Sequence, residues 1–204
     1  ILNDDLKQIQ DIALKWGEAA KRTLYKRVWG RITTNPTMDY DSKALVHADH
    51  NNIINAALDP NSYKDARIKL ANQTEPGSNE VIGLTPSYLL VPLNLEEMAY
   101  QLTQEAWGKA NNVPDFHQTF RVKPVVLRHL TDTNDWWLVA DPMSIDIVEL
   151  GFLFGNEEPE FFVQDDPRQG YTFSNDQIKY KVRHEYEAEP LDHRGVVGSV
   201  VAGG

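Results

Sequence analysis

The chain has 204 residues, 41% of them hydrophobic, which is enough for one substantial core or for two lobes. It contains no cysteine, which excludes disulfides, thiolate metal sites and thiol catalysis, and no run of about 18 apolar residues that would predict a transmembrane helix. The net charge of −10 is uneven, because residues 135–192 hold 14 acidic and 4 basic side chains. This part of the chain is poorly suited to DNA binding, since phosphates are bound by lysine and arginine.

A long amphipathic helix is predicted first, over residues 6–33. Asn3, Asp4 and Asp5 favour a helix start, and Asn35-Pro36 follows its end. Apolar or small residues recur at the spacing of one helix face: Leu6, Ile9, Ala13, Trp16, Ala20, Leu24 and Val28. Against the single Glu18, the second half carries Lys15, Lys21, Arg22, Lys26, Arg27 and Arg31. This basic side is either a solvated helix face or a strut that faces acidic neighbours or nucleic acid.

The middle of the chain alternates between loops and short elements. Residues 35–56 are predicted as a loop, and residues 63–73 as a short helix capped by Ser62 or Asn61. The apolar run at 86–92, bounded by prolines, predicts a short buried strand. Residues 93–107 are predicted as a helix with Asn94 as its cap.

The last third of the chain is rich in predicted strands. Two of these, 122–130 and 135–140, flank a turn at 131–134, and two more are predicted at 145–154 and 159–164. In Trp136-Trp137 we expect one ring in the core and the other against a neighbour or solvent. Because helices come early and strands late, the predicted fold class is α+β.

Residues 178–188 alternate without an error and predict one strand of roughly 35 Å. One face carries Ile178, Tyr180, Val182, His184, Tyr186 and Ala188, and we expect it to pack on the long helix. The wet face is charged, basic at first and acidic later, and with the nearby Glu189 it consists of Lys179, Lys181, Arg183, Glu185, Glu187 and Glu189. A second copy running antiparallel would match these charges, so the six residues are candidate subunit contacts. Ion pairing within the same sheet is the alternative.

Two polar clusters were weighed as sites of chemistry. His47, Asp49 and His50 have side chains that bind transition metals, which suggests a metal-dependent hydrolase, but their spacing matches no zinc-protease motif and favours a hydrogen-bonded loop. Asp192 and His193 could orient a catalytic base, but no nucleophile motif accompanies them, and a turn closed by Gly195 is favoured. No catalytic, cofactor-binding or metal-binding residue is therefore predicted.

Several fragments, in order and spacing, resemble one family of tailed-phage proteins, the Mu-like major head subunits (gpT-like), which in many relatives are fused behind a prohead protease. The fragments are residues 1–6, Asn35-Pro36, 44–52, 84–92, Leu95-Glu96, 136–142, 181–184 and 191–195. The resemblance extends from Ile1 to about Val197. Each fragment alone is weak, and the ordered set is fairly specific.

The resemblance implies a Hong Kong 97-type capsid fold. Residues 1–40 would form the spine helix of a peripheral lobe, residues 41–143 a mixed axial lobe, and residues 144–204 the long-stranded antiparallel sheet of the peripheral lobe and a C-terminal tail. The N-terminal arm and extended loop of the family are missing from this chain, so we expect a trimmed or separately expressed core of a longer protein.

The resemblance also implies a function without catalysis or cofactor. The protein would be the major capsid protein of a tailed phage or prophage, assembled from copies of itself as hexamers and pentamers into an icosahedral shell. Scaffold or prohead protease would be partners, packaged DNA would be contacted non-specifically, and no membrane would be involved. The subunit would be made in the bacterial host cytoplasm and end in the virion. The alternative is a non-viral shell of the same fold, a nanocompartment or a gene-transfer particle.

Overall fold

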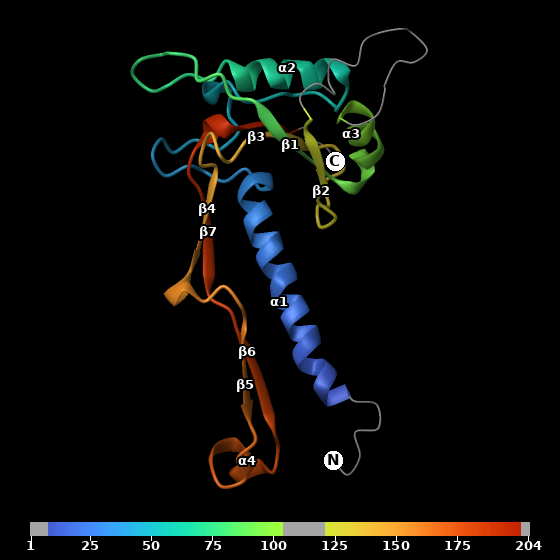
Figure 1. The fold of residues 1–204 in the computed structure, drawn as a ribbon, viewed down its shortest axis with the longest axis vertical. Helices are drawn as coiled ribbons and strands as arrows, with labels where there is room; N and C mark the ends of the chain where they lie inside the picture. The colour runs from blue at the N-terminus through green and yellow to red at the C-terminus, as the bar shows by residue number, and fades with distance from the viewer. Residues whose placement is uncertain (1–7, 104–120, 201–204) are drawn as a thin grey trace. The chain divides into compact units, whose positions relative to one another are not determined.

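The computed structural model describes residues 8–103 and 121–200, and the chain divides into two compact units (Figure 1). Unit 1 comprises Ile1–Gly30 and Leu150–Glu189, and unit 2 comprises Arg31–Glu149 and Pro190–Gly204. Both units mix helices with strands, so the fold is α+β, as predicted.

Unit 2 is built on a four-stranded sheet in the order β2-β1-β3-β8. Its strands are β1 (Pro86–Val91), β2 (Lys123–Val126), β3 (Trp136–Ala140) and β8 (Val196–Ser199). β1 runs parallel to β2 and antiparallel to β3, and β3 pairs antiparallel with β8. The two strands predicted around the turn at 131–134 therefore exist but do not pair with each other, because β1 lies between them. This correction could not be made from spacing alone, since β1 comes from a distant part of the sequence.

Both tryptophans of β3 are buried, with exposed fractions of 0% for Trp136 and 1% for Trp137. The expectation that one ring would face a neighbour or solvent was wrong. The sheet is covered on both faces: every residue of β3 is buried. The Trp136 indole donates a hydrogen bond to the carbonyl of Ala56 at 3.1 Å, which satisfies its polar atom inside the core.

Two helices pack on this sheet, α2 (Pro60–Ala71) against β3 and β8, and α3 (Glu96–Thr103) against β1 and β2. The cap of α2 is Asp59, not Ser62 or Asn61 as predicted. Ser62 has the second role in a capping box, because its hydroxyl accepts a hydrogen bond from the Asp59 backbone at 2.9 Å.

The short 3-10 turn η2 (Leu93–Leu95) precedes α3. Asn94 lies inside this turn and is not a helix cap, which corrects the prediction. The rest of the predicted helix, 104–107, lies outside the described residues.

Unit 1 contains most of α1 (Gln8–Thr33) and a ribbon of two antiparallel strands, β5 (Glu160–Gln164) and β6 (Lys179–Arg183). The short helix α4 (Gly170–Asn175) lies in the loop between them. The predicted long helix is confirmed over the described residues, and its expected start at residue 6 lies outside them. A second pair, β4 (Val148–Phe152) with β7 (Tyr186–Pro190), lies where the chain passes between the units.

The predicted single strand at 178–188 is two strands, β6 and β7, interrupted at His184 and Glu185. The two halves pair with different partners, so the predicted single sheet is two separate ribbons. The partner strands β4 and β5 are themselves separated by the turn η4 (Leu153–Gly155), where Phe154 has φ 56°. The alternation is kept throughout: odd-numbered residues from 179 to 189 are exposed and even-numbered residues from 180 to 188 are partly or fully buried. The start of the alternation was predicted too early, because Ile178 is 47% exposed.

The hydrophobic core of the described residues lies in unit 2. Of 26 buried hydrophobic residues, only Ala188 belongs to unit 1. Unit 1 is therefore held by backbone pairing, partly exposed aromatic contacts and ion pairs, and by little core of its own.

Candidate subunit-contact surface

The six charged residues predicted as subunit contacts all lie in unit 1 and are all exposed. The structure places three of them on β6, one in the interruption and two on β7: Lys179, Lys181, Arg183, Glu185, Glu187 and Glu189. They therefore share the exposed side of the alternation but not one continuous strand.

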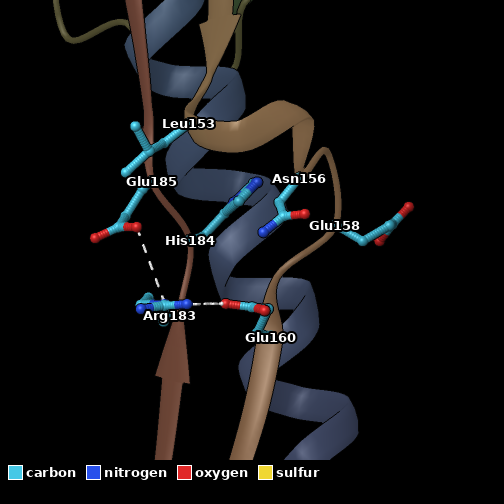
Figure 2. Close-up of a pocket in the computed structure, with 7 residues that line it drawn as sticks. All are labelled: Leu153, Asn156, Glu158, Glu160, Arg183, His184 and Glu185. Atoms are coloured by element: carbon cyan, nitrogen blue, oxygen red, sulfur yellow. Dashed lines mark hydrogen bonds and ion pairs between the residues drawn. The ribbon is translucent and has the colours of Figure 1, made fainter.

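The three basic residues of this set, Lys179, Lys181 and Arg183, contact side chains of their own ribbon or of the loop between its strands. Arg183 donates to the Glu160 carboxylate of β5 from Nη2 at 2.6 Å and from Nε at 2.9 Å, and Glu185 lies 4.0 Å from Arg183 Nε (Figure 2). The hydrogen bond to Glu160 raises the pKa of Arg183 above its ordinary value. Lys179 lies over the Tyr171 ring, with Nζ 3.1 Å from its centroid, and Lys181 lies 4.6 Å from that of Phe162. These cations pair internally, at the strength of exposed contacts.

Among the acidic residues of this set, Glu187 also has a partner in its own chain. Glu187 accepts hydrogen bonds from Arg27 of α1, from Nη2 at 2.7 Å and from Nε at 3.0 Å. This ion pair joins α1 to β7 inside unit 1. Arg183 and Glu187, which would be central to a charge match with a second copy, thus already have partners in their own chain.

A small pocket lies beside Arg183, and Figure 2 shows Arg183 between Glu160 and Glu185, with His184 directed into the pocket. The volume is ≈ 10 Å³, which is room for about one water molecule, whereas ligand pockets take about 300 Å³ or more. His184 contacts the carbonyl of Glu157 at 3.1 Å. This pocket is a turn packed around an ion pair and is too small to hold a substrate.

Unit 1 exposes apolar side chains that sequence reasoning missed. Phe161, Phe162 and Val163 follow one another in β5 and are 38%, 39% and 45% exposed. Because successive strand residues point to opposite faces, a run of three places apolar groups on both faces of a ribbon. This run of three apolar residues is present in the sequence and could have been used to predict an exposed apolar surface. Trp16 of α1 meets Phe161 edge to face at 6.2 Å between ring centroids, which covers one face only in part.

A wider groove of ≈ 700 Å³ lies at the far end of the ribbon, next to α4. Its lining combines apolar and acidic side chains: Ile12, Asp165, Pro167, Thr172, Asp176, Gln177, Ile178 and Tyr180. The carboxylates of Asp165 and Asp176 have no hydrogen-bond or ion-pair partner in the described part of the chain.

The residues considered for metal binding lie in unit 2 and are used in a loop. His50 is 7% exposed, with Nε2 2.6 Å from Asp41 Oδ2 and Nδ1 3.2 Å from the carbonyl of Leu45. His47 Nδ1 accepts the backbone N–H of Asp49 at 3.1 Å. Within residues 8–103 and 121–200, no three His, Cys, Asp or Glu side chains are grouped to hold a metal ion. The geometry of His47, Asp49 and His50 fits the hydrogen-bonded loop. It provides no metal site among the described residues that would support the hydrolase hypothesis.

The predicted turn at 191–195 is formed, with Asp192 capping the 3-10 turn η5 (His193–Gly195). Arg194 donates to Asp192 from Nε at 2.9 Å, while His193 Nδ1 contacts the Tyr40 hydroxyl. The His193 ring also stacks on His50, 3.9 Å between centroids. Asp192 therefore pairs with Arg194, and the imidazole is packed rather than oriented as a base.

These observations define a class: an α+β protein whose candidate surface consists of exposed charges and apolar side chains. The chain belongs to a family of phage capsid proteins, whose family model matches residues 1–199. A search of curated proteins gave no match. Among the described residues, no helix has the length and apolar character needed to cross a membrane. A capsid family is structural, and its members associate with copies of themselves to form a shell.

Proposed function

We propose that the protein is the major shell subunit of a tailed-phage or prophage head and assembles with copies of itself into a closed icosahedral shell around DNA. The observation that carries this proposal is the family match over nearly the whole chain. The physical support is unit 1, which exposes aromatic side chains and has almost no buried core. Apolar surface of this kind is characteristic of regions that are covered by a partner.

Within this proposal the fold is of the Hong Kong 97 type and the relationship is to the Mu-like head subunits. Unit 1, with α1 as the spine and the ribbons as the strands, corresponds to the peripheral lobe. Unit 2, with the four-stranded sheet, corresponds to the axial lobe. Residues 190–204, expected with the peripheral strands, are assigned to the axial lobe here, because they belong to unit 2 and β8 pairs with β3.

The test is assembly of the native gene product, purified and studied by sedimentation velocity and electron microscopy. We expect closed particles with five-fold and six-fold groups of subunits. A protein that stays monomeric when purified, and also when co-expressed with the scaffold and prohead-protease genes of its own locus, would contradict the proposal. Nuclease-protected DNA in the particles made in the host distinguishes a phage head from a shell that encloses protein cargo.

The six charged contact residues are tested separately. Lys179→Glu with Lys181→Glu reverses two cations that contact only aromatic rings of their own chain, whereas Arg183→Glu would also break the pair with Glu160. If these six charged residues contact a neighbouring subunit, the double variant assembles poorly although its circular dichroism is unchanged. Normal particles would exclude this contact.

A further inference from the structure

One side of α1 carries a row of exposed cations. Lys15, Arg22 and Lys26 are spaced by seven and four residues, which places them within about 40° of one another on the helix surface. All three are exposed, and none has an ion-pair partner in the described part of the chain. Leu14, 66% exposed, and Tyr25, 43% exposed, lie about 80–100° to one side of the row. We call these five residues the α1 stripe.

The three cations of the α1 stripe face away from their own ribbon. Trp16, which meets Phe161, and Arg27, which binds Glu187, lie about 100° to one side of the cations. Lys21, which lies 3.5 Å from Glu158, is about 120° to the other side. The ribbon is therefore reached from the opposite side of α1, and the stripe cannot turn to it without breaking these contacts.

The groove at the end of the ribbon has the complementary chemistry. Its lining combines the carboxylates of Asp165 and Asp176, which have no ion-pair partner in the described part of the chain, with apolar surface from Pro167, Ile178 and Tyr180. The charge of the two segments of unit 1 differs in the same sense: residues 1–30 carry six basic and four acidic side chains, and residues 150–189 carry four basic and nine acidic. Cations beside apolar groups on one surface match carboxylates beside apolar groups on the other.

We propose that the α1 stripe of one subunit docks on the Asp165–Asp176 groove of a second copy of this chain. The inference rests on the proposed function, because the occupant is another shell subunit. Two different surfaces of one molecule that fit each other make a head-to-tail contact, and repetition of such a contact builds a ring when its rotation closes. The contact also covers apolar groups that unit 1 leaves exposed on α1 and beside α4.

The test uses three charge-reversal variants of the native gene product. The stripe variant is Lys15→Glu, Arg22→Glu and Lys26→Glu. The groove variant is Asp165→Lys and Asp176→Asn, where asparagine is chosen because residue 176 has φ 53° and asparagine tolerates the left-handed region. The third variant combines both sets. Each is first checked for unchanged circular dichroism and unchanged thermal unfolding.

We expect the stripe variant and the groove variant each to need a protein concentration on the order of 30-fold higher for assembly. The combined variant recovers assembly, because every contact again joins opposite charges. The wild-type contact weakens in 1 M salt, where charges more than about 3 Å apart are screened. Lys64→Glu, Lys123→Glu and Arg128→Glu make the matched control, with the same change in charge on exposed residues of unit 2, and it should assemble as wild type does.

The outcomes separate the two proposals. If the unchanged chain forms no oligomer under any condition tested, both the shell function and this contact are excluded. If the unchanged chain assembles and the stripe variant does so equally well, only the contact is excluded. Loss of assembly in the control as well, or no recovery in the combined variant, would also exclude the contact. A stripe variant that assembles normally but lacks packaged DNA would reassign the stripe to nucleic acid.

Discussion

Asn52 is the main polar link between the loop at 45–52 and the start of β8. Its side chain is fully buried, donates hydrogen bonds to the carbonyls of Leu45 at 2.8 Å and Val196 at 3.0 Å, and accepts one from the His47 N–H at 2.9 Å. The His47 N–H has no other hydrogen-bond partner among the described residues, whereas the Leu45 carbonyl also contacts His50 Nδ1 at 3.2 Å.

We expect Asn52→Ala to lower the free energy of unfolding by about 2–4 kcal/mol, because it removes the hydrogen bonds that the Asn52 side chain makes with three backbone groups. Urea unfolding followed by tryptophan fluorescence measures this change. Asn55→Ala is the matched control, since Asn55 is exposed, and it should change the value by less than about 0.5 kcal/mol. Equal effects of the two substitutions would contradict the role assigned to Asn52.

The protonation of His193 is disturbed by its surroundings. Burial lowers its pKa from 6.5 to about 4, and the neighbouring charge of His50 acts in the same direction, while Asp192 opposes it. The ring stacks on His50 and contacts the Tyr40 hydroxyl, so a second positive charge has no favourable place there.

The sign of the resulting pH dependence follows from linkage. Below pH 6.5 His193 binds a proton in the unfolded chain but not in the folded chain. The contribution of neutral His193 to the free energy of unfolding is therefore fully present above pH 6.5 and is lost as the pH falls toward 4. The lowered pKa of Asp41, caused by its hydrogen bond to His50, acts only below about 3.8 and does not overlap this range.

We therefore expect the urea midpoint to fall between pH 7 and pH 4.5, and to fall less steeply in His193→Asn than in the unchanged chain. The comparison is between slopes, since His193→Asn also removes the stacking on His50. His47→Asn is the control, because asparagine can still accept the Asp49 N–H. Parallel slopes in the unchanged chain and His193→Asn would contradict the account.

At the scale of elements, α2 begins with a capping box that depends on Asp59. Its carboxylate accepts the backbone N–H groups of Asn61 at 2.8 Å and of Ser62 at 2.7 Å. Because these are helix N–H groups without intrahelical partners, the cap stabilises the first turn of α2. The hydrogen bond from the Ser62 backbone lowers the pKa of Asp59, with burial opposing it and the other hydrogen bonds assisting.

Asp59→Ala should cost about 1 kcal/mol of unfolding free energy, and Asp59→Asn much less, since asparagine caps helices about as well. Urea unfolding of the two variants at pH 7 measures both. If alanine and asparagine behave alike, the cap does not contribute as described.

The elements also show where prediction succeeded and why. α1, β1 and the alternation at 179–189 were predictable because periodicity is a local property of the sequence. The pairing of strands was not: β1 separates β2 from β3, and the alternating segment divides between two partner strands. The cap of α2 was missed by two or three positions, because helix boundaries depend on local backbone geometry that composition indicates only loosely.

At the scale of the whole molecule, the two units differ in what stabilises them. Unit 2 contains all but one of the buried hydrophobic residues of the described chain, and unit 1 has exposed aromatic residues and ion pairs at its surface. Regions with few buried apolar contacts open at lower free energy than the global unfolding of a protein.

Hydrogen exchange monitored by mass spectrometry should therefore show faster exchange in β5 and β6 than in β1 and β3 of the unassembled subunit. In assembled particles, the ribbon and the groove should gain protection, while the unit 2 sheet changes little. Equal protection of the ribbon and the sheet in the free subunit would contradict this assignment of stability.

The sequence by itself determined the class of the fold, the long helix, the alternating segment and, through ordered fragments, the resemblance to phage head subunits. These follow from local periodicity and from residue patterns that can be recognised without coordinates. Only the tertiary structure decided which strands pair, that both tryptophans of β3 are buried, and that Arg183 and Glu187 are engaged within their own chain. The physical reason is that pairing and burial depend on residues far apart in sequence, whose contacts exist only after the chain has folded.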